Sequence, residues 1–167
     1  NIQLLLGITQ SLIQFGRLSE AKKWIQKVTP SVRKDNPFDV ALYQFTRATY
    51  LLQAQQFEHL ESLLKKASAG FSSGQQLLWK AYCIKYFGDA CRFQNNIPKA
   101  KSYYQKSQVF LSQAQHPFNA VLLQDMAIIA LYDSEFNDAL TFAQEALHHL
   151  SAMGWKRWIP RSQIIAM

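Results

Sequence analysis

The sequence has few of the residues that interrupt helices and few that cross-link a fold. Its 167 residues include six glycines, five prolines and two cysteines. Cys83 and Cys91 fall in one expected helix, where their spacing places them about 12 Å apart and excludes a disulfide between them. We therefore expect two reduced thiols and a reducing, cytoplasmic compartment.

Groups that carry catalysis or bind metals are also scarce. Asp and Glu together number 11, and none forms a convincing pair for acid–base chemistry. His148 and His149 are adjacent in an expected helix, so their rings diverge by about 100° and do not share a metal ion. The sequence contains no nucleophile elbow, phosphate loop or glycine-rich fingerprint. We therefore expect no enzyme activity, no catalytic residue, no cofactor and no metal.

Long hydrophobic runs are missing as well. The longest uninterrupted apolar stretch covers residues 126–132, far fewer than the roughly 20 residues that a membrane-spanning helix needs. No signal peptide is apparent at the N-terminus. Because the chain begins at Asn1 and stops inside an apparent helix, we expect it to be a piece of a longer protein. The short apolar runs lead us to expect no interaction with membranes.

The positive charge is spread rather than concentrated. Net charge is +7 and the sequence pI is about 9.5, which permits an acidic partner such as nucleic acid or an anionic protein surface. The basic residues occur in scattered pairs, such as Lys22-Lys23 and Lys65-Lys66, with no long basic run. This pattern favours a solvated surface, so nucleic-acid binding is the weaker interpretation.

Helical periodicity dominates the sequence that remains. Apolar residues recur at intervals of three and four, and their 49% share is enough for a substantial core. Residues 86–111 show the pattern best, as two amphipathic helices joined by a turn at Asn95-Asn96. Weaker copies on both sides predict an all-α array of helical hairpins. We place these units at about residues 1–30, 37–69, 74–114 and 117–152, with a partial fifth at 155–167.

The hairpins repeat with a constant register. The hydrophobic residues after each turn are Leu18, Phe57, Ile97 and Phe136, at intervals of 39, 40 and 39 residues. Small residues recur at fixed offsets from them, where the two helices of a hairpin must approach closely. Three aligned sets result: Thr9, Ala48, Gly88 and Ala127; Ala21, Leu60, Ala100 and Ala139; and Val28, Ala67, Ser107 and Ala146. Such units cannot bury their apolar faces alone, so stacking must form a continuous core.

This pattern resembles the tetratricopeptide repeat (TPR). The third unit matches best: Phe87-Gly88 stands where the family has Leu-Gly, Ala100 at its helix-B alanine and Tyr104 at its helix-B aromatic residue. The period is longer than the family's usual repeat of about 34 residues. The resemblance implies a right-handed superhelix of stacked antiparallel hairpins, with four repeats plus one terminal helix. The long repeats look like those in the sensor domains of maltose-regulator-like bacterial transcription activators.

In such a superhelix the first helix of each hairpin lines a concave groove. By resemblance, ten candidate binding residues fall there: Phe45, Thr49, Leu52, Tyr82, Lys85, Asp89, Arg92, Gln124, Ile128 and Leu131. The implied function is a non-catalytic scaffold that binds a protein or peptide in the groove. The alternative is an effector-sensing domain of a transcriptional regulator, with a small effector as its ligand.

Two groups of residues allow more than one interpretation. Lys85, Asp89 and Arg92 share one helix face and form either a local ion-pair ladder or a polar anchor for a peptide. Trp79, Tyr82, Tyr86 and Phe87 crowd one helix, which favours core packing over a ligand platform.

The two tryptophans near the end of the chain also have two interpretations. Trp155 and Trp158 either pack on a further repeat or provide an association surface. The second interpretation would allow homo-oligomers through the terminal helix.

Overall fold

Stacked helices account for the fold of the described chain. The computed structural model describes residues 1–73, 76–113, 116, 118–154 and 159–166. Four hairpins follow one another: α1 (Ile2–Gln14) with α2 (Leu18–Val28), α3 (Pro37–Gln53) with α4 (Leu60–Ser73), α5 (Leu77–Phe93) with α6 (Ile97–Gln113), and α7 (Phe118–Tyr132) with α8 (Phe136–Ala152). A short 3₁₀ turn, η1 (Thr29–Ser31), follows α2, and the terminal helix is α9 (Ile159–Ala166).

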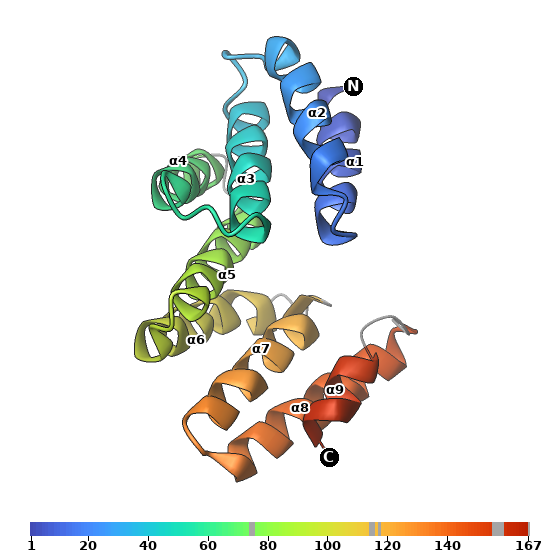
Figure 1. Cartoon of the computed structure of the whole chain (residues 1–167), viewed down its shortest axis with the longest axis vertical. Coiled ribbons are helices and arrows are strands. Elements are labelled where there is room, and N and C mark those ends of the chain that lie inside the picture. Colours follow the sequence, from blue (N-terminus) through green and yellow to red (C-terminus); the bar gives the residue numbers. More distant parts are fainter. Residues whose placement is uncertain (74–75, 114–115, 117, 155–158, 167) are drawn as a thin grey trace.

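The hairpins stack into a curved array. Figure 1 shows them running from α1 and α2 at the top to α8 and α9 at the bottom, with α4 on the outer side. Within each hairpin the two helices pack on each other, and the second helix of each hairpin packs on the first helix of the next unit. In addition, α1 packs on α3. The predicted all-α superhelix of four hairpins plus a terminal helix is confirmed. Trp155 and Trp158 lie outside the described residues.

Each hairpin turn ends its first helix in the same way. Gly16, Gln55, Asn95 and Ser134 occupy equivalent positions, and all have positive φ between 55° and 73°. In each turn the next residue donates its N–H to the carbonyl five residues earlier, as Arg17 does to Leu12 at 2.9 Å. This is the Schellman arrangement, which satisfies the last carbonyls of a helix. Only Gly16 and Asn95 are residue types that commonly adopt this left-handed conformation.

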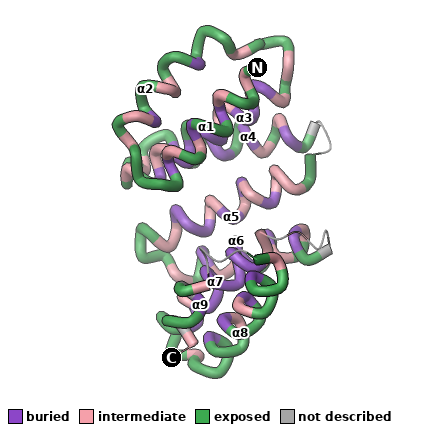
Figure 2. The backbone as a smooth tube through the Cα atoms, turned by 90° about the vertical axis from the view of Figure 1, so that its right-hand side faces the viewer, coloured by how far each residue is buried: buried purple, intermediate pink, exposed green. Residues whose placement is uncertain are grey.

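Close helix approach is the feature that all four hairpins share. All twelve residues of the three aligned sets are buried, which bears out the predicted register. Figure 2 shows buried residues concentrated where helices face one another. Among the described glycines the tightest surroundings are those of Gly88, where an added Cβ would overlap the ring of Tyr104 on α6. Among the described residues, no helix is long and apolar enough to cross a membrane.

We predict that Gly88→Ala destabilises the chain by about 1–3 kcal/mol, because the new methyl group overpacks the α5–α6 contact. Denaturation in urea measures this change. Gly7→Ala is the matched control, because Gly7 is also helical but has nothing within 4 Å of an added Cβ. We expect Gly7→Ala to stabilise by roughly 0.5–1 kcal/mol through helix propensity. Equal effects of the two changes would contradict a close approach at Gly88.

We also predict that Gln55→Gly stabilises the chain by about 0.4–1 kcal/mol, since φ at Gln55 is 55° and glycine adopts that conformation without strain. The neighbouring Gln56→Gly removes a similar side chain outside the left-handed region and should not stabilise. Thermal unfolding of both variants measures the difference. A loss of stability with Gln55→Gly would show that its side chain matters more than its backbone strain.

Candidate functional site

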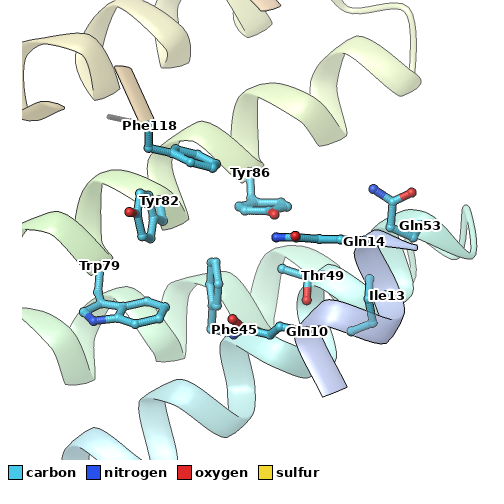
Figure 3. Close-up of a pocket in the computed structure, with 10 residues that line it drawn as sticks. All are labelled: Gln10, Ile13, Gln14, Phe45, Thr49, Gln53, Trp79, Tyr82, Tyr86 and Phe118. Atoms are coloured by element: carbon cyan, nitrogen blue, oxygen red, sulfur yellow. The ribbon is translucent and has the colours of Figure 1, made fainter. Parts of the chain in front are cut away.

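A cavity lies where the first helices of successive hairpins meet. Its volume is about 280 Å³. The lining comes from α1, α3, α5 and the first residue of α7, so every hairpin contributes to it. The lining residues, all shown in Figure 3, are Gln10, Ile13, Gln14, Phe45, Thr49, Gln53, Trp79, Tyr82, Tyr86 and Phe118.

Aromatic rings form one side of the cavity (Figure 3). Phe45 meets Trp79 edge to face at 5.7 Å and Tyr86 at 5.2 Å between ring centroids. Tyr82 meets Phe118 of α7 in the same geometry at 4.7 Å. Edge-to-face ring pairs contribute interaction free energy in addition to that from the apolar area that they bury. The ring contacts therefore help to hold these side chains in position.

The four clustered aromatic residues of α5 have two different roles. Trp79, Tyr82 and Tyr86 are separated by three and four residues, so they share one helix face and all line the cavity. Phe87 lies one residue further, on a different face, and stacks on Tyr103 of α6 at 5.4 Å. Core packing therefore describes Phe87, while the other three also present surface to the cavity.

Carboxamide and hydroxyl groups form the rest of the cavity wall. Gln10 and Gln14 lie one turn apart on α1, and Thr49 and Gln53 lie one turn apart on α3. The Gln10 amide nitrogen donates to the Thr46 hydroxyl at 3.1 Å, which fixes α1 against α3. Carboxamides both donate and accept hydrogen bonds, as peptide groups do.

The two tyrosines of the cavity stay neutral at physiological pH. Burial raises the pKa of Tyr82 to about 12. The pKa of Tyr86 is also raised to about 12, and burial is the largest cause. Burial disfavours the phenolate because it removes water from the charged form. The Tyr82 hydroxyl lies 3.4 Å from the ring nitrogens of His116. Both hydroxyls therefore act as hydrogen-bonding groups and not as bases.

Lys85 lies behind the aromatic wall, inside a buried ionic cluster. Only 7% of the residue is exposed. Its ammonium binds the carboxylate of Asp89 at 2.8 Å and that of Asp125 on α7 at 2.7 Å. Tyr104 of α6 donates its hydroxyl hydrogen to Asp89 at 2.6 Å, and Arg92 donates to the Tyr104 oxygen at 3.3 Å. The cluster therefore joins α5, α6 and α7.

The charges of this cluster compensate one another. Burial alone would lower the pKa of Lys85, but the carboxylates of Asp125 and Asp89 outweigh it and raise the pKa above its ordinary value. Burial and the same carboxylates raise the pKa of Tyr104, so its hydroxyl keeps its proton. Lys85 and Asp89 do form the ion pair expected within α5, and Asp125 extends it to the next hairpin.

The ten predicted groove residues do not converge on one place. Phe45, Thr49 and Tyr82 line the cavity, whereas Lys85, Asp89 and Arg92 belong to the ionic cluster. Leu52 is buried in the core and Gln124 donates to Ser162 of α9 at 2.6 Å. Ile128 is half-buried and Leu131 is 39% exposed, and neither lines the cavity. Their use in binding stays a prediction.

Of the ten lining residues, only Phe45, Thr49 and Tyr82 were among the candidate binding residues. Those missed include Gln14, Gln53 and Phe118. Gln14 and Gln53 stand 39 residues apart at the ends of equivalent helices, so the repeat register was a usable signal. Phe118 gave no such signal, because its position depends on how the fourth hairpin packs against α5. Among the described residues, no three His, Cys, Asp or Glu side chains group as metal ligands would.

Comparison with known proteins identifies the class of fold. No protein-family model and no curated protein matches the sequence. The apo form of RapI superposes with a TM-score of 0.80 at 11% identity, over 98% of this chain and 61% of RapI. This chain therefore spans less than two thirds of RapI.

A protein named as a kinesin light chain from Podosopora anserina, with nearly identical TPR-like repeats, also matches. One structure gives a TM-score of 0.64 at 12% identity, over 90% of this chain and 75% of that one. A second gives 0.64 at 11% identity, over 98% and 94%. These matches confirm the TPR-like fold. The narrower resemblance to maltose-regulator sensor domains stays a prediction.

We predict that Lys85→Met destabilises the chain by about 3–5 kcal/mol, because it leaves the buried carboxylates of Asp89 and Asp125 without their cation. Urea denaturation measures the change. Lys66→Met makes the same substitution at an exposed position on α4 and should change stability by no more than about 0.5 kcal/mol. Similar small effects of both changes would mean that the ionic cluster does not hold the hairpins together.

Proposed function

We propose that this chain is a non-catalytic binding module whose concave face holds a peptide or an extended segment of a partner protein. The observation that carries this proposal is the cavity to which α1, α3, α5 and α7 all contribute side chains. A concave, mostly apolar site with a few polar groups is the usual form of a binding pocket. Its rings can bury an apolar side chain, while its carboxamides can bind peptide groups.

The composition of the cavity supports binding rather than catalysis. The described residues that line it include no carboxylate, histidine, cysteine or lysine, and these are the side chains that most often transfer protons or attack substrates. Its two tyrosines hold their protons until about pH 12. The lining therefore supplies hydrogen bonds and apolar surface without a group that reacts near neutral pH.

An effector-sensing domain of a transcriptional regulator is the second candidate, and the ionic cluster favours it. Phe118 begins α7 and lines the cavity, and Asp125 further along α7 is held by Lys85 of α5. A ligand in the cavity would contact helices from all four hairpins. It would shift the superhelix toward whichever hairpin arrangement binds it better. RapI is described in an apo form, which implies a liganded state of that protein.

A phage-displayed library of random peptides would test the proposed function. We expect wild type to enrich a sequence family that Gln53→Trp does not bind, because the larger side chain fills the cavity from its rim. Gln56→Trp is the matched control, since Gln56 is exposed and does not line the cavity. Enriched peptides that bind both variants equally would place the site elsewhere. No enrichment with wild type would contradict peptide binding.

Small-angle scattering with an enriched peptide separates the two candidate functions. A scaffold keeps its radius of gyration when the peptide binds. A sensor changes it, because the hairpins move relative to one another.

A further inference from the structure

The side chains that line the cavity carry no formal charge at neutral pH. Three are glutamines and five are aromatic, and Ile13 and Thr49 complete the set. Among the residues that the structure describes, no basic side chain lines the cavity, although the chain has a net charge of +7. A ligand group that enters here loses water without meeting an opposite charge, which is costly for an ion and tolerable for a neutral group.

The nearest buried cation does not alter this conclusion. The Lys85 ammonium lies 5.2 Å from the centroid of the Tyr86 ring and 5.9 Å from that of Phe118. Its hydrogen bonds go to Asp89 and Asp125, so it is already paired and does not attract a ligand carboxylate. With Arg92 the cluster holds two cations and two carboxylates, so it offers a ligand ammonium no uncompensated negative charge either. An ammonium that enters the cavity therefore loses its water without gaining an ionic partner.

The size and polarity of the cavity further limit the kinds of ligand group that it can hold. A volume of about 280 Å³ lies just below the roughly 300 Å³ at which pockets for drug-sized ligands begin. One large side chain with its adjoining peptide groups is suited to such a space. The rings, already arranged edge to face, offer partners to another ring. Figure 3 shows Gln14 and Gln53 on the side away from Trp79, where peptide groups would lie.

We infer that the cavity selects an uncharged aromatic side chain of a bound peptide, together with its flanking peptide groups, and rejects side chains that carry a formal charge. This inference rests on the proposed function and adds a rule for the ligand. The rings bind the side chain, and the glutamines and Thr49 bind the backbone. The described lining residues offer an ion no opposite charge, so ions are excluded.

Four capped tripeptides of the form acetyl-Gly-Xaa-Gly-amide, with Phe, Leu, Glu or Lys in the centre, would test the rule. Each is titrated into the protein while the indole N–H signal of Trp79 is followed by NMR. Trp79→Phe identifies that signal by its loss. We expect the Phe peptide to bind roughly tenfold or more tightly than the Glu and Lys peptides, because burying either charge is costly, with the Leu peptide between them.

A charge placed in the lining should change the preference. We expect Gln53→Glu to raise the affinity for the Lys peptide relative to the Phe peptide by roughly tenfold, as a partner for the buried ammonium becomes available. Gln56→Glu adds the same charge outside the cavity and should leave the ratio unchanged. If Gln56→Glu changed the ratio as much, overall charge would govern the preference, and the inference would be overturned.

The outcomes separate this inference from the function on which it rests. If a charged peptide bound wild type as tightly as the Phe peptide while shifting the Trp79 signal, the rule would fail and peptide binding at this cavity would stand. If none of the four peptides shifted the signal at saturating concentration, peptide binding at this cavity would fail, and the rule with it.

Discussion

Close contact between the two helices of each hairpin is the constraint on which the structure depends. Small side chains at repeated positions let the helix backbones approach, as Gly88 does against Tyr104. This contact places Tyr104 where its hydroxyl reaches Asp89 at 2.6 Å. Asp89 in turn helps to hold Lys85, which binds Asp125 in the next hairpin. Close packing of Gly88 on Tyr104 inside the third hairpin thus helps to position the ion pair between Lys85 and Asp125, which joins the third and fourth hairpins.

The same helix, α5, serves the core and the cavity with different faces. Its contacts with α6 use Gly88 and Phe87, while Trp79, Tyr82 and Tyr86 line the cavity. Lys85 lies between these roles, because it binds carboxylates on one side and lies near two cavity rings on the other. A movement of the cavity rings would therefore displace Lys85 and alter the ionic cluster that joins the third and fourth hairpins. This connection gives the sensor interpretation its physical basis.

The binding that we propose for the cavity depends on what surrounds it as much as on what lines it. Carboxylates around Lys85 keep its charge paired behind the aromatic wall. Burial keeps the hydroxyls of Tyr82 and Tyr86 protonated. Glutamines from two helices add uncharged groups that donate and accept hydrogen bonds. The resulting surface is polar enough to bind peptide groups and apolar enough to bury a ring.

The sequence by itself determined the repeat, its register and the all-α class, because helical periodicity and small residues at contact points are local patterns. It also placed Lys85, Asp89 and Arg92 on one helix face, and Phe45, Thr49 and Tyr82 among the groove residues. Only the tertiary structure decided that the first three are joined to Asp125 and Tyr104, while the others meet Trp79 and Phe118 at a cavity. The physical reason is that these contacts depend on the angles between hairpins. Those angles result from packing among residues far apart in the chain, which periodicity along one helix does not encode.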